Sequence, residues 1–232
     1  MIKDVSVLIY SCDKYSDVWE PFFTLFFRYW NCPYNVYLTT ETLKCPVDGV
    51  ITLNYSGGQW TDRIRAAVQD IPTEYVIGMC EDMFIRKPVR QLVIDLCANA
   101  MDIDRNITCF NFEREYEWCM PSEYSEFGQK LYNSIYRKSC QPTLWRKDDL
   151  IEYLSVSLSP WEWELSPTPN KSKHYVFIGD EKDLVFDYGY YNHQWFGIRK
   201  GKWVEQDVVP LFEKEHISVD YSIRGFYKEE EN

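Results

Sequence analysis

The chain has 232 residues, which is enough for one substantial core and does not require a second domain. Its formal net charge of −11 argues against nucleic-acid binding, because that affinity comes mostly from Lys and Arg that neutralise phosphates. The eight cysteines form no CxxC pair, and the N-terminal segment lacks the apolar core of a signal peptide. We therefore expect a cytoplasmic protein without a transmembrane segment, compatible with peripheral association at the inner face of a membrane.

The first half of the sequence alternates between apolar runs and amphipathic segments. The apolar runs predict strands at 5–10, 35–40, 50–53, 75–79 and 107–110. The amphipathic segments predict helices at 17–29, 61–71 and 89–100, the first of them capped by Asp17. This alternation predicts an α/β fold with a mostly parallel central sheet flanked by helices.

The second half is less regular. Residues 113–137 are acidic and aromatic without a clean period, and we interpret them as an irregular excursion over the sheet face. Further along, the pattern predicts an extended segment at 139–145, a helix at 147–158, a hairpin of 175–178 with 184–186, and a helix at 207–214. We expect one domain, 1–232, with an elaborated C-terminal half.

Two adjacent carboxylates, Glu81 and Asp82, follow the apolar run at 75–79. The carboxyl end of such a strand is where α/β proteins place their chemistry. Magnesium and manganese prefer oxygen ligands and take only one or two carboxylates from the protein, so the pair predicts a site for a divalent cation, Mn²⁺ or Mg²⁺. The alternative is an acidic pair exposed to solvent at a turn.

Three segments resemble the GT-A-type bacterial glycosyltransferases of polysaccharide and capsule biosynthesis, in the nucleotide-diphospho-sugar transferase superfamily. They are residues 7–15 at the first strand, Trp-Thr-Asp-Arg at 60–63, and residues 75–84. The last segment is similar to the DXD-type motif, with Glu81 where an Asp is common. The resemblance covers roughly the first 145 residues. It implies a GT-A-like fold in which residues 1–112 bind the nucleotide-sugar and residues 113–232 face the acceptor.

The same resemblance implies roles for single residues. It implies nucleotide contacts by Ser11, Asp13, Lys14, Asp62 and Arg63. Asp82 is the first candidate for the metal, and Glu81 and His193 are the others. On residue type alone, Asp13 is equally well explained as a turn residue, Arg63 as a surface residue, and His193 as a hydrogen-bonded surface residue.

Trp161-Glu162-Trp163-Glu164 resembles a Trp-Glu-x-Glu segment found late in such enzymes. Glycosyl transfer with inversion needs a general base that deprotonates the acceptor hydroxyl, and we predict Glu162 for this role, with Glu164 second. An extended segment would place both Glu side chains on one face, whereas in a helix they would diverge by about 200°. The alternative is packing of the Trp side chains with exposed Glu.

Together these features predict a metal-assisted glycosyltransferase. It would move a sugar from a nucleotide-diphosphate donor to a glycan or lipid-linked acceptor in surface polysaccharide synthesis. A catalytically inactive carbohydrate-binding or scaffold protein on the same fold is one alternative, favoured by the aromatic content of 17% and by Glu81. A metal-dependent phosphoesterase is another, disfavoured because only three scattered histidines are present.

Overall fold

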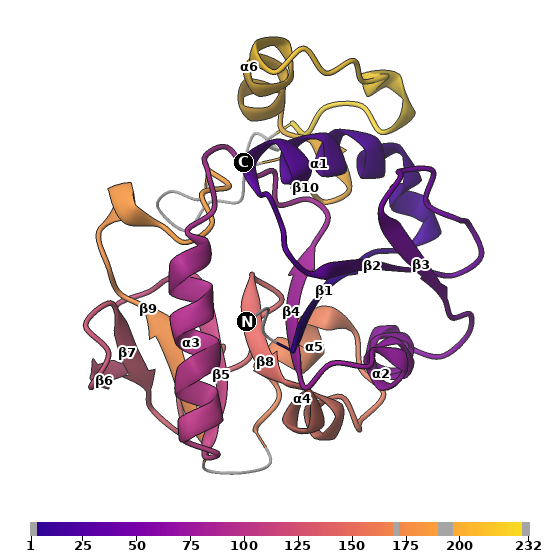
Figure 1. Ribbon diagram of the computed structural model, residues 1–232. Coiled ribbons are helices and arrows are strands. Elements are labelled where there is room, and N and C mark those ends of the chain that lie inside the picture. The colour runs from indigo at the N-terminus through magenta and orange to yellow at the C-terminus, as the bar shows by residue number, and fades with distance from the viewer. Residues whose placement is uncertain (1–3, 169–171, 190–196, 229–232) are drawn as a thin grey trace.

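A mixed sheet forms the centre of the molecule (Figure 1). The computed structural model describes residues 4–168, 172–189 and 197–228. Within these ranges the sheet has nine strands in the order β3-β2-β1-β4-β8-β5-β9-β7-β6. The strands are β1 (Val5–Tyr10), β2 (Asn35–Thr40), β3 (Val50–Asn54), β4 (Tyr75–Cys80), β5 (Ile107–Arg114), β6 (Cys119–Pro121), β7 (Phe127–Lys130), β8 (Thr143–Arg146) and β9 (Lys173–Phe177).

Most of these strands run in one direction. Strands β3, β2, β1 and β4 are parallel neighbours, β8 lies antiparallel between β4 and β5, and β9 is parallel to β5. Strand β7 runs antiparallel to both β9 and β6. The predicted α/β class, with a mostly parallel central sheet flanked by helices and an elaborated C-terminal half, is therefore confirmed.

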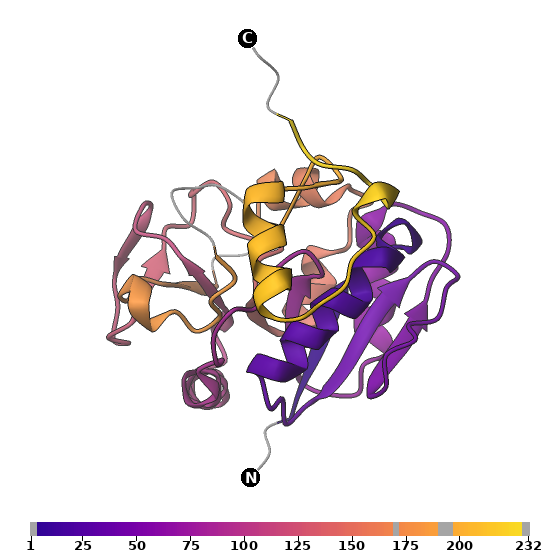
Figure 2. The same cartoon turned by 90° about the horizontal axis from the view of Figure 1, so that it is seen from above.

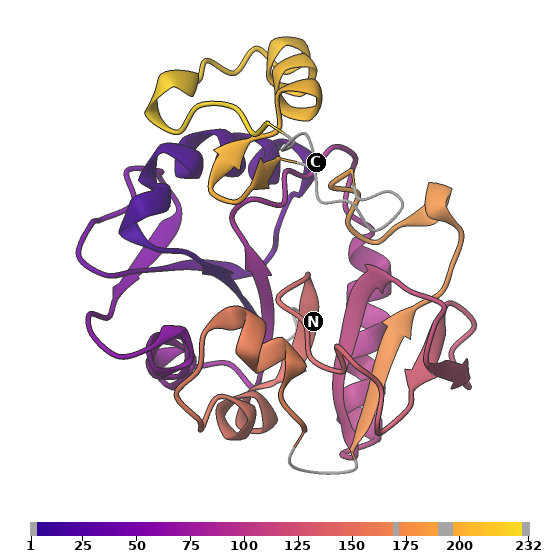
Figure 3. The same ribbon diagram turned by 180° about the vertical axis from the view of Figure 1, so that it is seen from behind.

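Helices cover both faces of the sheet (Figures 1 and 3). They are α1 (Ser16–Tyr29), α2 (Trp60–Asp70), α3 (Gln91–Ile103), α4 (Lys147–Tyr153), α5 (Pro160–Leu165) and α6 (Glu205–Lys214). Helices α1 and α3 pack on one face, and α2, α4 and α5 on the other. Along β1, Val7 and Ile9 join the first cluster while Leu8 and Tyr10 join the second, which explains why this strand is apolar throughout.

Two predictions for the second half are wrong. The stretch 113–137 is not only an excursion, because it contains β6 and β7, which extend the sheet beyond β9. The predicted hairpin of 175–178 with 184–186 does not form: β9 pairs with β5 and β7, and the chain after it turns through the short 3₁₀ helix Glu181–Asp183. Strands β5 and β7, which are distant from β9 in sequence, occupy the hydrogen-bonding positions on its two sides, so residues 184–186 cannot pair with it.

The C-terminal segment lies along α1 (Figures 1 and 2). It comprises β10 (Ile198–Arg199), β11 (Lys202–Trp203), α6 and the 3₁₀ helix Tyr221–Ile223. Arg28 Nη1 donates to Glu215 Oε2 at 2.6 Å, and Arg224 Nε donates to Asp17 Oδ2 at 2.7 Å. Asp17 therefore holds the C-terminal segment and does not cap α1, whose N-cap position is Tyr15. No helix in the described ranges is long and apolar enough to cross a bilayer.

Candidate active site at the carboxyl edge of the sheet

The carboxylate pair stands at the end of β4, next to the loop that follows β1. Glu81 is only 6% exposed, and its Oε1 accepts a hydrogen bond from Ser11 Oγ at 2.8 Å. Ser11 Oγ in turn accepts from Trp19 Nε1 at 2.7 Å. Asp82 is partly exposed. The structure thus brings Ser11 together with both carboxylates, and it orients Glu81 through a buried hydrogen-bonded chain.

Burial of the pair shifts its protonation. Desolvation raises the pKa of Glu81, and repulsion from Asp82 raises it further. Desolvation also raises the pKa of Asp82, and the positive charge of Arg224 partly offsets both pKa shifts. Two carboxylates held together in this way fit a divalent cation, because a cation removes their repulsion.

A cation here would need ligands from its substrate. Within the described ranges, no group of three or more His, Cys, Asp and Glu is placed to hold a metal. Magnesium characteristically takes one or two protein carboxylates and completes its shell with phosphate oxygens and water. Asp82 and Glu81 would hold such a cation jointly with a diphosphate. His193, the third predicted ligand, lies outside the described residues.

Asp13 organises a loop. Its Oδ1 accepts from the backbone N–H of Glu41 at 3.1 Å and of Leu43 at 3.2 Å, and its Oδ2 accepts from Thr42 Oγ1 at 2.6 Å. These bonds join the loop after β1 to the loop after β2. The contact of Asp13 with a nucleotide stays a prediction, and the geometry shows a side chain that already has its partners.

The Asp62 side chain also accepts a hydrogen bond from the backbone. It lies in the first turn of α2, where its Oδ2 accepts from the N–H of Gln59 at 2.8 Å and from Ser157 Oγ at 2.6 Å. This is the carboxylate half of a capping box. Beside it, Arg63 Nη2 lies 3.5 Å from Glu41 Oε1 and remains partly exposed. Lys14 is exposed, and its carbonyl accepts from Arg224 Nη2 at 2.9 Å.

Arg224 is a site residue that sequence reasoning missed. Its guanidinium carbon lies 4.4 Å from the centre of the Tyr15 ring, and its charge acts on both Glu81 and Asp82. Gly197 helps the C-terminal segment reach this edge: its φ is +104°, and a Cβ there would lie 2.9 Å from the Asp82 carbonyl oxygen. No sequence signal connected this distant segment with β4.

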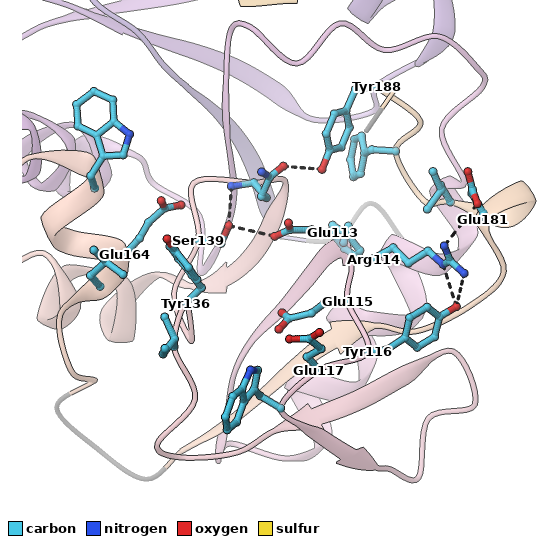
Figure 4. Close-up of a pocket in the computed structure, with 18 residues that line it drawn as sticks. Glu113, Arg114, Glu115, Tyr116, Glu117, Tyr136, Ser139, Glu164, Glu181 and Tyr188 are labelled. Atoms are coloured by element: carbon cyan, nitrogen blue, oxygen red, sulfur yellow. Dashed lines mark hydrogen bonds and ion pairs between the residues drawn. The ribbon is translucent and has the colours of Figure 1, made fainter. Parts of the chain in front are cut away.

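A cavity of about 810 Å³ opens beyond β8 (Figure 4). Five of its described lining residues are Glu113, Glu115, Glu117, Glu164 and Glu181. Glu113 lies at the end of β5, and Glu115 and Glu117 lie in the chain that follows it, where residues 117 and 118 form a turn. Glu164 faces them from α5 across the cavity (Figure 4). The sequence did contain a signal for this cavity, namely the pattern Glu-x-Glu-x-Glu at residues 113–117, inside the stretch 113–137 that we interpreted as irregular.

The two Glu residues of the Trp-Glu-Trp-Glu segment are separated because the segment is helical. Glu162 Oε2 accepts from the N–H of Ser159 at 2.9 Å and from Ser159 Oγ at 2.7 Å, which makes it the carboxylate half of the capping box of α5, outside the cavity lining. Glu164 lines the cavity and accepts from the N–H of Cys140 at 2.6 Å. Burial raises the pKa of Glu164. Trp163 is buried and packs against Trp60, with ring centroids 5.5 Å apart.

Cys140 connects the carboxylate pair with the cavity. Its thiol raises the pKa of the Cys80 thiol at the end of β4, and its N–H donates to Glu164 Oε1. The segment just before β8 therefore lies between the carboxylate pair that follows β4 and the acidic cavity.

Comparison with protein-family models and with curated proteins finds no match. Several solved structures are similar in fold. The structure of S. aureus TarS is 12% identical with a TM-score of 0.51, over 77% of this chain and 36% of that one. The bifunctional IspDF from Campylobacter jejuni is 11% identical with a TM-score of 0.48, over 76% of this chain and 50% of that one. The 2-C-methyl-D-erythritol 4-phosphate cytidylyltransferase from Thermus thermophilus is 13% identical with a TM-score of 0.47, over 76% of this chain and 89% of that one. The chain thus spans about half or less of the first two. The likeness to TarS, at a TM-score of 0.51, is one of fold.

Proposed function

We propose that this protein transfers a glycosyl group from a nucleotide-diphosphate donor, bound at Glu81 and Asp82, to a glycan or lipid-linked acceptor in the cavity. One observation carries the proposal: β4 and β5 run in the same direction on either side of β8, so the carboxylate pair after β4 and Glu113 of the acidic, aromatic cavity at the end of β5 stand at the same edge of the sheet. Two substrates can therefore meet there. Acceptors of surface polysaccharide synthesis, presented at the inner face of the membrane, fit this arrangement.

On the donor side, Asp82 is the more exposed carboxylate of the pair, while Glu81 is fixed by Ser11. Arg224 lies beside the pair, and Arg63 lies at the start of the neighbouring helix, so positive charge is available for phosphate oxygens. A divalent cation, when bound, would stabilise the negative charge of the leaving diphosphate.

On the acceptor side, we assign the general base to Glu164. It lines the cavity, whereas Glu162 is held at the start of α5 by Ser159. A raised pKa makes a carboxylate a stronger base near neutral pH, and burial raises the pKa of Glu164. Its hydrogen bond from the Cys140 N–H orients the carboxylate within the cavity lining, where an acceptor hydroxyl would approach it.

Nucleotidyl transfer is the nearest competing reaction, and the loop after β1 disfavours it. Residues 11–16 contain no glycine and a single cationic side chain, Lys14. Loops that enclose a triphosphate use glycines so that backbone N–H groups can approach the phosphates. We therefore favour transfer of the sugar over transfer of the nucleotide.

Thermal unfolding with UDP-sugars and GDP-sugars, with and without Mn²⁺, tests the proposal. A donor at one hundred times its Kd should stabilise the protein by about 2.7 kcal/mol, and only in the presence of metal. Asp82→Asn should abolish the metal-dependent part, while Asp48→Asn, a substitution before β3 and away from the pair, should retain it. Absence of any nucleotide effect at millimolar concentration would refute the proposal.

A further inference from the structure

The cavity carries more negative charge than its own cations balance. Glu115 Oε2 lies 2.7 Å from Lys130 Nζ, and Glu181 Oε2 lies 3.6 Å from Arg114 Nη1. Glu113, Glu117 and Glu164 form no ion pair within the part of the chain that the structure describes. The lining as a whole therefore favours a positively charged ligand and disfavours a phosphate or an acidic sugar.

The raised pKa values of two carboxyl groups in the cavity lining agree with this excess of negative charge. Burial raises the pKa of Glu113 to about 7, and repulsion from Glu115 and Glu164 adds to the effect against the opposing charge of Lys130. Burial likewise raises the pKa of Glu164. Each of these carboxylates would be stabilised in its charged form by a cation within the cavity.

A buried amide in the lining has a donor without an acceptor. Gln141 is 1% exposed and lines the cavity, and its Oε1 accepts from Tyr188 OH at 2.5 Å. Its Nε2 has no hydrogen-bond acceptor among the residues that the structure describes. Most buried donors in proteins are paired, so this one indicates a ligand acceptor such as a hydroxyl oxygen.

Aromatic rings are displayed around the same opening. Tyr116, Trp118, Tyr136 and Trp161 line the cavity, and each is more than half exposed. Trp118 and Tyr136 have φ values of 58° and 53°, in the left-handed region that costs non-glycine residues about 1–3 kcal/mol each. Exposed amphipathic rings of this kind make platforms for sugar rings.

We propose that the cavity binds an amino sugar with a free primary amine, whose ammonium group lies among Glu113, Glu117 and Glu164 while a hydroxyl oxygen accepts from Gln141. The inference rests on the proposed function and makes it more specific: the acceptor is a glycan that carries an unacetylated amino sugar. The carboxylates select the amine, and the rings and the amide select the sugar that carries it.

Isothermal titration calorimetry without nucleotide or metal tests this inference. The probes are a tetramer of glucosamine, the corresponding tetramer of N-acetylglucosamine, and tetralysine. We expect the glucosamine tetramer to bind at least tenfold more tightly than either of the others. Equal affinity for the acetylated tetramer would overturn the role of the amine, and equal affinity for tetralysine would overturn the role of the sugar.

Two matched variants locate the binding. Glu117 is exposed, so Glu117→Gln should fold normally and weaken the glucosamine tetramer about fivefold without changing the acetylated one. Glu213→Gln removes the same charge from an exposed position on α6, outside the cavity lining, and should change neither affinity. Unchanged binding in Glu117→Gln would overturn the assignment of the amine to this cavity.

The result can be separated from the fate of the proposed function. Metal-dependent stabilisation by nucleotide-sugars without binding of the glucosamine tetramer would remove only the amino-sugar inference. Binding of the glucosamine tetramer without any nucleotide effect would keep the cavity assignment and remove the glycosyltransferase.

Discussion

Replacing Glu113 with Gln tests whether the cavity keeps its negative charge at a cost in folding free energy. Glu113 lies at the end of β5, where Ser139 Oγ donates to its Oε2 at 3.5 Å, while Lys130 pairs with Glu115 instead. Burial raises the pKa of Glu113 from 4.5 to about 7. Gln retains the size of the side chain and the oxygen that accepts from Ser139, so the variant removes little more than the charge.

The size of the effect follows from the two pKa values. Because the folded-state pKa lies above the unfolded one, folding favours the protonated carboxyl. Its stabilisation is fully present below about pH 4.5 and is lost as the pH rises through 7. At about 1.4 kcal/mol per pKa unit, the wild type should lose about 3 kcal/mol relative to Glu113→Gln between pH 4.5 and pH 8. For a chain of this length that is a change of roughly 6–12 °C in Tm.

Urea unfolding of both proteins, at half-unit steps from pH 4.5 to pH 8, measures this difference directly. Other groups titrate in both proteins, so the difference between the two curves isolates Glu113 and its neighbours. Glu152→Gln, an exposed position on α4, serves as the control and should follow the wild type at every pH. A difference between wild type and Glu113→Gln that does not change with pH would refute the reasoning.

Three further substitutions probe the hydrogen-bonded carboxylates. Asp13→Ala should lower the free energy of unfolding by about 1–3 kcal/mol, because the N–H groups of Glu41 and Leu43 lose their acceptor; unchanged urea unfolding would show that the loop is held by other contacts. Glu162→Gln should leave the stability nearly unchanged and spare turnover, whereas Glu164→Gln should slow turnover about 100-fold or more. A Glu162→Gln protein that binds donor without turnover would return the base role to Glu162.

Strands β1 and β4 were predictable because each is a mostly apolar run that is buried in the middle of the sheet. Val5–Tyr10 and Asn35–Thr40 have the bounds expected from composition alone. The short strands of the second half were not, since β6 has three residues and β7 has four, too few for a period to be recognised. Their positions depend on partners that are distant in sequence, which no local pattern contains.

The residues of the candidate site were likewise predictable from the sequence only in part. Glu81 and Asp82 were placed correctly at the end of β4 because an apolar strand ends abruptly in two charges. The position of Arg224 was not predictable, because it depends on how the C-terminal segment packs along α1. Glu162 and Glu164 could not be separated until the segment was known to be helical, since an extended chain places both on one face.

The antiparallel insertion of β8 also fixes a length. Strands β4 and β5 are two strand spacings apart, roughly 10 Å at about 4.8 Å each, and backbone hydrogen bonds maintain this separation. This spacing sets the span between the end of β4, which carries the carboxylate pair, and the end of β5, which carries Glu113. If the proposed reaction takes place here, a donor with a longer sugar portion would not be accommodated by moving these strands apart, because that would break the ladder. We therefore expect the backbone to limit donor length, with side-chain substitutions adjusting it only within that span.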